Sequence, residues 1–483
     1  MKLFKKDSSF YGKVFTIAIP IALQSLITIG VNMLDNIMLG KLENADAPMS
    51  AASLANSFIG IYHIFCMGLG MGASVLVSRY WGMKQDKTLK NVDPDKALKQ
   101  TIAIMLRITL LLATLFAVAT YFIPDAIMKM YIQNPAGVNG VYTAEELAKI
   151  SLNKEILKQG IEYLRYSVIT FFFAGTSLTS TIVLRSVGQV KLPLFVSIGA
   201  FFVNLGANYV LIFGKFGAPR MEVAGAALGT LIARIFEAVC IVGYLLFIDK
   251  KISFRFKHLF MKTKSLLSEY FRICIPVLIS DGILALGNNA VAMVIGRLGG
   301  QFVTANSITM TTQQLSTVVV QGVSQGGAIV TGQTLGAGDK EKTMEQGYLF
   351  LGLGIGLGIL SAIFIMVTSN PIISFFSEAS VEAKAIAAKL MVAISIIMIF
   401  QATNSIMTKG VLRGGGDTKV LMIADNIMLW VISIPLGILA GFVFKLSPFW
   451  IYICLKSDQI LKAFWCVLRL RSGKWIKKIT TGK

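Results

Sequence analysis

Long apolar stretches, separated by short polar and basic segments, dominate this chain. An α-helix needs about 20 mainly apolar residues to cross the hydrocarbon core of a bilayer. Stretches of that length occur near residues 14–40, 52–80, 100–123, 160–184, 192–214, 223–248, 271–296, 304–333, 345–369, 383–410, 419–443 and 446–467. The pattern predicts an all-α polytopic membrane protein with twelve transmembrane helices.

The last of these stretches is the weakest. Lys456, Asp458 and Lys462 interrupt its apolar run. Because charged groups avoid the bilayer core, we expect the inner half of this stretch to lie along the membrane interface.

The second half of the chain repeats the first. Three segments recur in the same order, and they align Pro20 with Pro276, Gly68 with Gly322, and Arg185 with Arg413. With six spans in each copy, both copies enter the membrane in the same direction, as in transporters whose substrate cavity lies between parallel repeats. We therefore expect an N-lobe over residues 1–250 and a C-lobe over residues 251–483 with a basic cytoplasmic tail.

The two copies differ in length between their third and fourth spans. The repeat spacing shortens from 256 residues at Pro20 and Pro276 to 228 residues at Arg185 and Arg413. The N-terminal half therefore carries an insertion, which we place in the polar stretch 133–158. We expect this stretch to be a loop outside the cell.

Composition agrees with a membrane protein. Hydrophobic residues make up 55% of the 483 positions and charged residues only 15%, whereas a soluble protein has about 25% charged residues. The net charge is +21, but the basic residues flank apolar spans and do not cover one face of a domain, so we expect membrane lipid and not nucleic acid as a partner. They gather before the first span, after the second, between the sixth and seventh, and in the tail.

That distribution predicts the orientation in the membrane. Cytoplasmic loops carry the excess of Lys and Arg, so we expect a multi-pass protein of the plasma membrane with both termini cytoplasmic. The five cysteines show no CxxC spacing and there are only two histidines, which favours neither a disulfide framework nor a zinc site. GGGDTK lacks the GxxxxGK[ST] form of an ATP-binding loop. We expect no enzyme activity, no cofactor and a functional monomer.

Three motifs resemble the multidrug and toxic compound extrusion (MATE) family. They are IP-x14-D-x4-G in the first span, with Pro20, Asp35 and Gly40; G-x3-G-x5-GQ-x2-GAG from Gly322 to Gly338; and LRGGGDTK from Leu412 to Lys419. The resemblance covers nearly the whole chain. It implies a secondary active antiporter that exports amphipathic, often cationic, organic compounds or drugs in exchange for sodium ions or protons.

The wider superfamily also contains flippases of lipid-linked precursors, which is the alternative function. A flippase cavity should carry several basic residues for a pyrophosphate. The charges that we place inside the spans are acidic, which favours efflux of a small-molecule substrate.

Asp35 is the first candidate for the coupling site. It lies about 9 Å inside its helix, where a carboxylate is costly and is a functional candidate. It can hold a sodium ion or take a proton, and the resemblance implies an ion-coupling role. The alternative is a snorkelling or capped carboxylate near a helix end.

Asn204, Asn208 and Thr230 are the proposed partners of Asp35. Asn204 and Asn208 are four residues apart and share a helical face. Relatives often have Asn-x3-Asp here, so Asn208 replaces an acid with an amide that ligates sodium but does not titrate. The coupling ion therefore stays open, as does the alternative that the asparagines only bond across a helix interface.

Asp281 is the candidate in the C-lobe. It lies about 13 Å along its helix, near the midplane, where it is placed to meet a cationic substrate or to exchange a proton. Its repeat partner is Ser25, and the resemblance implies a glutamate at this place in many relatives. A buried structural hydrogen bond is the alternative. We expect Asn288 and Gln314 to line the same cavity.

Two further titratable residues are weaker candidates. Asp425 lies near the cytoplasmic end of the eleventh span, where a structural pairing with Arg413 or Lys409 is the competing interpretation. His63 in the second span titrates near neutral pH in its ordinary state. A lone histidine on an apolar helix is more often a hydrogen-bonded packing residue.

Overall fold

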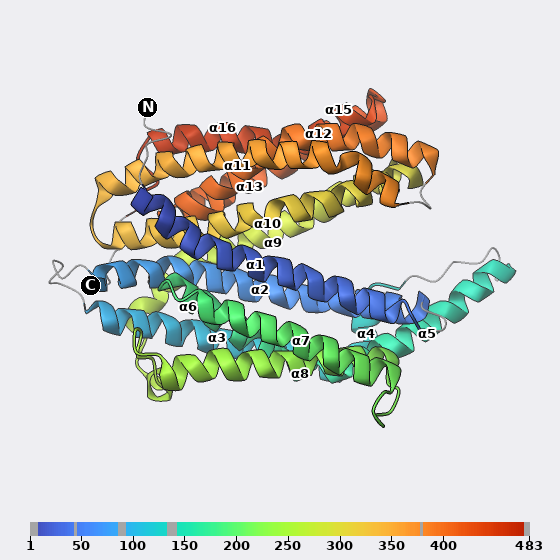
Figure 1. Ribbon diagram of the computed structural model, residues 1–483, viewed down its shortest axis with the longest axis horizontal. Coiled ribbons are helices and arrows are strands. Elements are labelled where there is room, and N and C mark those ends of the chain that lie inside the picture. Colours follow the sequence, from blue (N-terminus) through green and yellow to red (C-terminus); the bar gives the residue numbers. More distant parts are fainter. Residues whose placement is uncertain (1–7, 43–45, 86–92, 133–142, 377–379, 478–483) are drawn as a thin grey trace.

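The protein is a bundle of long helices that run side by side (Figure 1). The computed structural model describes residues 8–42, 46–85, 93–132, 143–376 and 380–477, and this part of the chain contains no strand. Its α-helices are α1 (Ser8–Leu39), α2 (Asp46–Gln85), α3 (Pro94–Phe122), α4 (Pro124–Lys129), α5 (Ala144–Ser167), α6 (Thr170–Ser186), α7 (Lys191–Phe213), α8 (Glu222–Gly243), α9 (Lys264–Arg297), α10 (Gly300–Gly336), α11 (Lys340–Phe375), α12 (Val381–Ser405), α13 (Thr418–Asn426), α14 (Ile434–Ile438), α15 (Pro448–Leu455) and α16 (Ser457–Arg471).

Several helices contain or end in π-helical turns. These are η1 (Tyr244–Ile248), η3 (Ile406–Leu412), η4 (Ile427–Ser433) and η5 (Leu439–Val443), while η2 (Phe256–Phe260) is a short 3₁₀ helix. Segments η3 and η4 continue α12 and α13, so each of these spans is partly π-helical. π-helical turns are rare and occur frequently at functional sites.

The helix boundaries follow local capping chemistry. Asp93 accepts hydrogen bonds from the backbone N–H groups of residues 95 and 96 at the start of α3, with Pro94 at the first helical position. Gly214 ends α7 with φ +67°, a left-handed conformation that glycine adopts at little cost. These caps satisfy backbone groups that a helix end leaves without partners.

Nine helices of the described part are long and apolar enough to cross a membrane, or ten if the α5–α6 pair, bent by 57°, forms one span. The helical membrane architecture is therefore confirmed. The other two predicted stretches correspond to α10, which carries many Gln, Ser and Thr residues, and to α15 with α16. The number of twelve spans stays a prediction.

The stretch 133–158 is only partly a loop. Residues 133–142 lie outside the described part, but α5 begins at Ala144 and continues to Ser167. Thr143 and Glu146 form a reciprocal capping box that starts this helix. The expectation of a loop is therefore wrong for the second half of the stretch.

The last predicted span is broken in two, and its charges do not lie at an interface. α15 ends at Leu455 and α16 begins at Ser457. Asp458 and Lys462 are each only 2% exposed. They are buried because they pair with each other and with groups of α13, so the expectation of an interfacial segment was wrong.

The helices form two groups. In Figure 1, α2–α8 occupy the lower part and α9–α16 the upper part, while α1 begins beside the upper helices and crosses toward the lower ones; both chain ends lie at the same end of the bundle. The segment between α8 and α9 packs against α3, where Arg107 donates to the carbonyl oxygens of Leu259 and Met261 at 2.5 and 2.8 Å. The arrangement agrees with two six-span repeats, although the lobe boundary near residue 250 stays a prediction.

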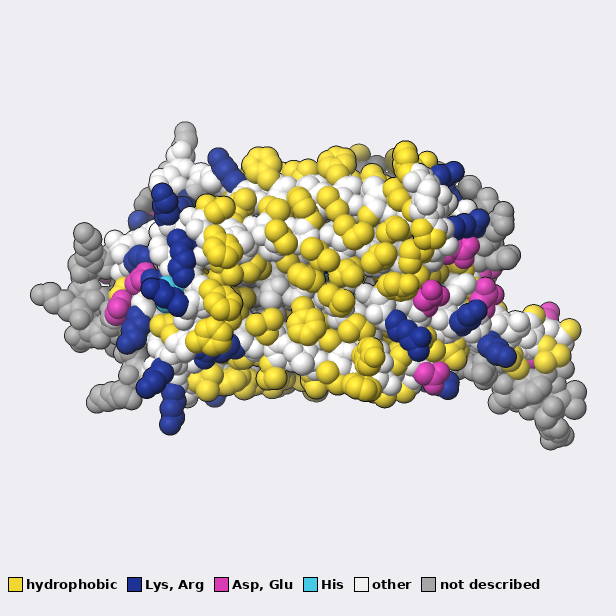
Figure 2. Space-filling view, turned by 90° about the horizontal axis from the view of Figure 1, so that it is seen from below, with side chains coloured by type: hydrophobic (Ala, Val, Ile, Leu, Met, Phe, Trp, Pro, Cys, Tyr) yellow, Lys and Arg dark blue, Asp and Glu magenta, His cyan; other side chains and the backbone are white. Residues whose placement is uncertain are grey.

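The surface has the pattern expected in a bilayer. Figure 2 shows a broad belt of exposed hydrophobic side chains, with charged side chains gathered at the two ends. Lys and Arg are especially dense at the end that carries the chain termini. Several of the basic residues that flank the spans fall in residues 1–7, 86–92 and 478–483, which lie outside the described part. We call this end the basic end.

At the basic end, α2 and α10 cross at very short range through repeat-related glycines. A Cβ atom added to Gly82 would lie 3.0 Å from the Cα atom of Gln333, and one added to Gly336 would lie 3.0 Å from the Cα atom of Arg79. The two contacts are equivalent under the repeat. Small residues allow such close approach of helices in membranes, which explains the glycine motif.

Two side chains reinforce this crossing in a reciprocal way. Arg79 of α2 donates to the carbonyl oxygen of Gly414 at 3.3 Å, and Gln333 of α10 donates to that of Ser186 at 2.9 Å. Arg79 also reaches the carbonyl oxygen of Lys477 at 3.1 Å. Arg79 belongs to the first repeat and its acceptors to the second, whereas Gln333 belongs to the second repeat and its acceptor to the first. We call the side chains of Arg79 and Gln333 the cross-repeat latch.

We predict that Gly82→Ala destabilises the protein by about 1–3 kcal/mol, because the added methyl group overpacks the crossing. The measurement is thermal unfolding of the purified protein in detergent. Gly60→Ala on the same helix is the control, since a Cβ atom there meets nothing within 4 Å. Equal unfolding temperatures for the two variants would contradict this account of the crossing.

Candidate functional site

Asp35 and the two asparagines of α7 come together in the N-lobe. The Nδ2 atom of Asn208 donates to Oδ1 of Asp35 at 2.6 Å and to Oδ1 of Asn204 at 3.3 Å. Asn204 and Asn208 are buried, and Asp35 is half-buried on α1. The structure thus assembles the predicted carboxylate and amides into one polar cluster.

The Asn208 amide has one free acceptor. Its Oδ1 atom is buried and has no hydrogen-bond partner in the described part of the chain. It lies against Gly229 of α8, where any larger side chain would collide with it. A half-turn of the amide would bring this oxygen beside the Asp35 carboxylate. The cluster then offers several oxygen ligands, which are the ligands that hard cations prefer.

Thr230 joins the same region through a tyrosine. The Tyr163 hydroxyl lies between Asn56, to which it donates at 3.2 Å, and Thr230, with which it also interacts. The Tyr163 hydroxyl is close enough to Asp35 for the two groups to interact electrostatically. Sequence reasoning missed Tyr163, because a tyrosine in a membrane helix carries no signal of its own.

A small cavity of about 60 Å³ opens beside the cluster. Asn204 and Thr230 line it, together with Arg234 and Glu237 of α8. Arg234 pairs with Glu237 at 2.7 Å. Sequence reasoning also missed this pair, although two charges inside the apolar stretch 223–248 were a signal for it.

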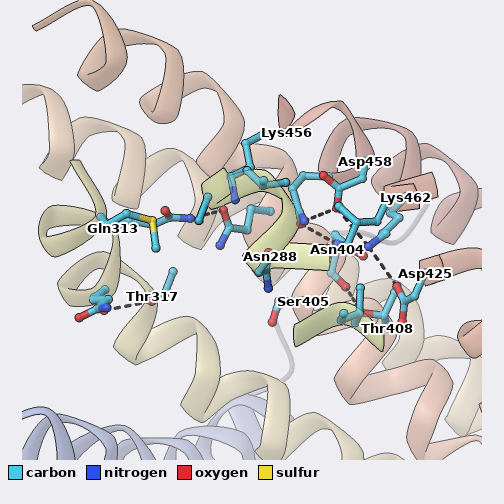
Figure 3. A pocket seen from close by; sticks show the side chains of 18 of the residues that line it. Asn288, Gln313, Thr317, Asn404, Ser405, Thr408, Asp425, Lys456, Asp458 and Lys462 are labelled. Atoms are coloured by element: carbon cyan, nitrogen blue, oxygen red, sulfur yellow. Dashed lines mark hydrogen bonds and ion pairs between the residues drawn. The ribbon is translucent and has the colours of Figure 1, made fainter. Parts of the chain in front are cut away.

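The C-lobe contains a much larger cavity of about 410 Å³ (Figure 3). Asn288 of α9 and Gln314 of α10 line it, as predicted from the sequence. Further polar lining comes from α12, η3 and α16, and apolar lining from α9 and η4. Its size lies within the range of about 300–1,000 Å³ that is usual for small-molecule sites.

Asp425 belongs to a buried charge cluster at this cavity. Lys462 contacts Oδ1 of Asp425 at 3.3 Å and Oδ2 of Asp458 at 3.1 Å (Figure 3). The predicted pairing of Asp425 with Arg413 or Lys409 is therefore wrong, since its partner is a lysine from the last span. The sequence did not reveal this partner because the broken helix brings it inward.

Asp281 occupies a different environment from the one expected. It pairs with Arg413 at 3.0 Å, and it is not among the residues that line the C-lobe cavity. Asn288 and Gln314 line that cavity without it. The contact agrees with the structural alternative for Asp281.

The Asp281 pair has a counterpart in the other repeat. Arg185, the repeat partner of Arg413, contacts Gln24 of α1 and donates to Oε1 of Gln325 at 2.9 Å. In both repeats, therefore, the arginine of the LR motif reaches the first helix of its own half. The N-lobe presents an amide there, whereas the C-lobe presents a carboxylate.

His63 stays apart from both cavities. It is half-buried on α2 and lines neither the N-lobe nor the C-lobe cavity. Its ring centroid lies 6.3 Å from that of Tyr62. This placement agrees with a packing role.

The expectation that charges inside the spans are acidic is also wrong. Lys409, Lys456 and Lys462 line the C-lobe cavity together with Asp425 and Asp458. The sequence analysis missed Lys456 and Lys462 because it treated the last span as interfacial.

Comparisons with known proteins agree with these findings. The MatE family model matches residues 20–210 and 276–439, one match in each half of the chain. An uncharacterized transporter YisQ of Bacillus subtilis is 23% identical over 98% of this chain and 97% of its own length. A probable multidrug resistance protein NorM of Thermotoga maritima is 24% identical over 96% of this chain and 93% of its own.

Solved structures share the fold. A crystal structure of MATE in the straight conformation matches with a TM-score of 0.80 at 16% identity, covering 96% of each chain. An outward-facing conformation of a multidrug resistance MATE family transporter of the MOP superfamily matches with a TM-score of 0.79, also at 16% identity and 96% coverage of each chain. Because the MatE family model matches more than half of this chain, the chain belongs to the MATE family of efflux transporters.

Proposed function

We propose that this protein is a secondary active antiporter that exports amphipathic organic compounds in exchange for sodium ions or protons, with the coupling ion at Asp35. One observation carries the proposal: the Asp35 carboxylate meets a buried amide, Asn208, that has a free oxygen. A carboxylate at this depth is costly. Binding of a cation or a proton removes that cost, which links ion occupancy to conformation.

Closure at the basic end supports alternating access. The cross-repeat latch and the glycine crossing join the two repeats there. While this end stays closed, solute can leave only toward the other end. Opening of the basic end requires Arg79 and Gln333 to break their hydrogen bonds with the other repeat. Ion binding in the N-lobe would drive transport by shifting the equilibrium between the states with these bonds formed and broken.

Flipping of a lipid-linked precursor stays the second proposal. The lysines of the C-lobe cavity favour an anionic ligand. Lys462, however, is fully engaged by two carboxylates. Too few free cations remain for a pyrophosphate, so efflux of smaller solutes is the better-supported function.

We further propose that the basic end faces the cytoplasm of a plasma membrane, in line with the positive-inside rule. Lys215 and Lys250 lie at opposite ends of the span formed by α8 and η1, and both are exposed. In a cysteine-free background, Lys215→Cys should react with an impermeant maleimide in whole cells. Lys250→Cys should react only after permeabilisation, and the reverse pattern would overturn this orientation.

We predict that Asp35→Asn abolishes ion-driven efflux. The variant keeps the size of the side chain but removes the charge that binds a cation or takes a proton. The measurement is dye efflux from proteoliposomes under sodium and proton gradients imposed separately, and the wild type should respond to one of them.

The control is Asp125→Asn, which removes an exposed carboxylate that pairs with Lys129 at the surface. It should transport like the wild type. Undiminished gradient-driven efflux by Asp35→Asn would remove Asp35 from the coupling mechanism. Solute binding measured without a gradient should persist in that variant, which separates lost coupling from misfolding.

A further inference from the structure

The C-lobe cavity contains a half-buried cation that the ion pairs described above do not use. Lys456 lies at the break between α15 and α16 and lines the cavity (Figure 3). Within the described residues its ammonium group has no hydrogen-bond or ion-pair partner. Asp458 attracts it from a distance and Lys462 repels it.

The carboxylates of the cavity are already satisfied. Lys462 bridges Asp425 and Asp458. The second oxygen of Asp425 accepts from Ser280 at 3.2 Å, and Gln459 donates to Asp458 at 2.6 Å. Each oxygen of these two carboxylates therefore already has at least one partner, and both carboxylates share the charge of Lys462.

The broken helix holds Lys456 in place. The Ser433 hydroxyl donates to the carbonyl oxygen of Leu455 at 2.9 Å and accepts from the backbone N–H of Asp458 at 3.3 Å. The Ser433 hydroxyl thereby supplies a hydrogen-bond partner to one backbone group on each side of the break. Irregular backbone is tolerated at membrane depth where it is buried in protein or lines a cavity, and broken helices form substrate sites in transporters.

The charges of the lining leave one ammonium group without a fixed partner. Three lysines and two aspartates line the cavity, and the lining is neutral once the exposed Lys409 is set aside. Lys456 is half-buried, and both aspartates form their ion pairs with Lys462 instead. A single negative charge beside Lys456 would supply the missing partner.

The rest of the lining suits an amphipathic molecule. Amide groups form a hydrogen-bonded row, in which Gln313 donates to Gln401 at 2.7 Å and Asn404 donates to Gln459 at 2.8 Å. Val291 and Leu429 add apolar surface. Such a combination holds a hydrophobic body and orients it by a few polar contacts.

We propose that this cavity binds amphipathic organic carboxylates, with Lys456 as the counter-ion of the carboxylate. The proposal rests on the proposed efflux function and narrows its substrate class, since it adds a negatively charged group to the amphipathic compounds considered above. Zwitterions that carry a carboxylate belong to the class.

The test compares two dyes that differ in one group. Rhodamine 110 carries a free carboxylate, and rhodamine 123 is its methyl ester. Fluorescence anisotropy with the full chain in lipid nanodiscs, without any gradient, measures binding, and empty nanodiscs correct for partition into lipid. The wild type should bind rhodamine 110 at least about tenfold more tightly than the ester.

Lys456→Gln should remove this preference, and Lys456→Arg should keep most of it. Lys389→Gln is the matched control, because Lys389 is an exposed lysine of the same lobe outside the cavity. Size-exclusion profiles and unfolding temperatures report whether each variant folds. If Lys456→Gln fails to fold, two other measurements still test the proposal. They are the preference of the wild type for rhodamine 110 and the effect of Lys409→Gln, which should weaken that preference.

A wild-type protein that binds both dyes equally, or prefers the ester, would overturn the proposal, as would a preference that survives in Lys456→Gln. Asp35→Asn separates this inference from the proposed function. It should keep the carboxylate preference while losing gradient-driven efflux. Absence of any gradient-driven transport by a wild type that keeps the preference would refute the efflux function and leave the binding site standing.

Discussion

The reciprocal contact between the two repeats at the basic end is the constraint on which the rest of the structure depends. Glycines bring the backbones of α2 and α10 together, and Arg79 and Gln333 each bond to a carbonyl oxygen of the opposite repeat. Because both halves contribute equivalent positions, a shift of either lobe at this end breaks contacts of both kinds. The Asp35 cluster and the C-lobe cavity thus lie in separate lobes that meet at this crossing.

The interior of each lobe is organised by the cost of placing charge in a bilayer. In the part of the chain that the structure describes, the charged groups enclosed by the two cavities are paired or hydrogen-bonded, apart from the half-buried Lys456. Paired charges of this kind add little stability by themselves, but removal of one partner is costly. Lys456 is therefore the group on which the proposed carboxylate site depends, and the ion pairs around it hold the neighbouring side chains in place.

The sequence predicted the helical membrane architecture, the internal repeat, the association of Asp35 with Asn208, and the lining role of Asn288. These features follow from apolar length, self-similarity and helical spacing, all of which are local properties. It did not identify the ion-pair partners of Asp281 and Asp425, because these partners depend on how distant helices pack. It failed most clearly for the last span, because charges that pair inside the protein look the same in sequence as charges that face water.

The arginines of the LR motif show what duplication has kept and what it has changed. Arg185 meets the neutral Gln24, whereas Arg413 meets the anionic Asp281, at adjoining positions of the repeat. The same scaffold position thus pairs a cation with a neutral amide in one half and with a carboxylate in the other. Two identical halves would have offered one electrostatic environment twice. The duplicated frame has therefore kept its geometry here while the two halves have come to differ in charge.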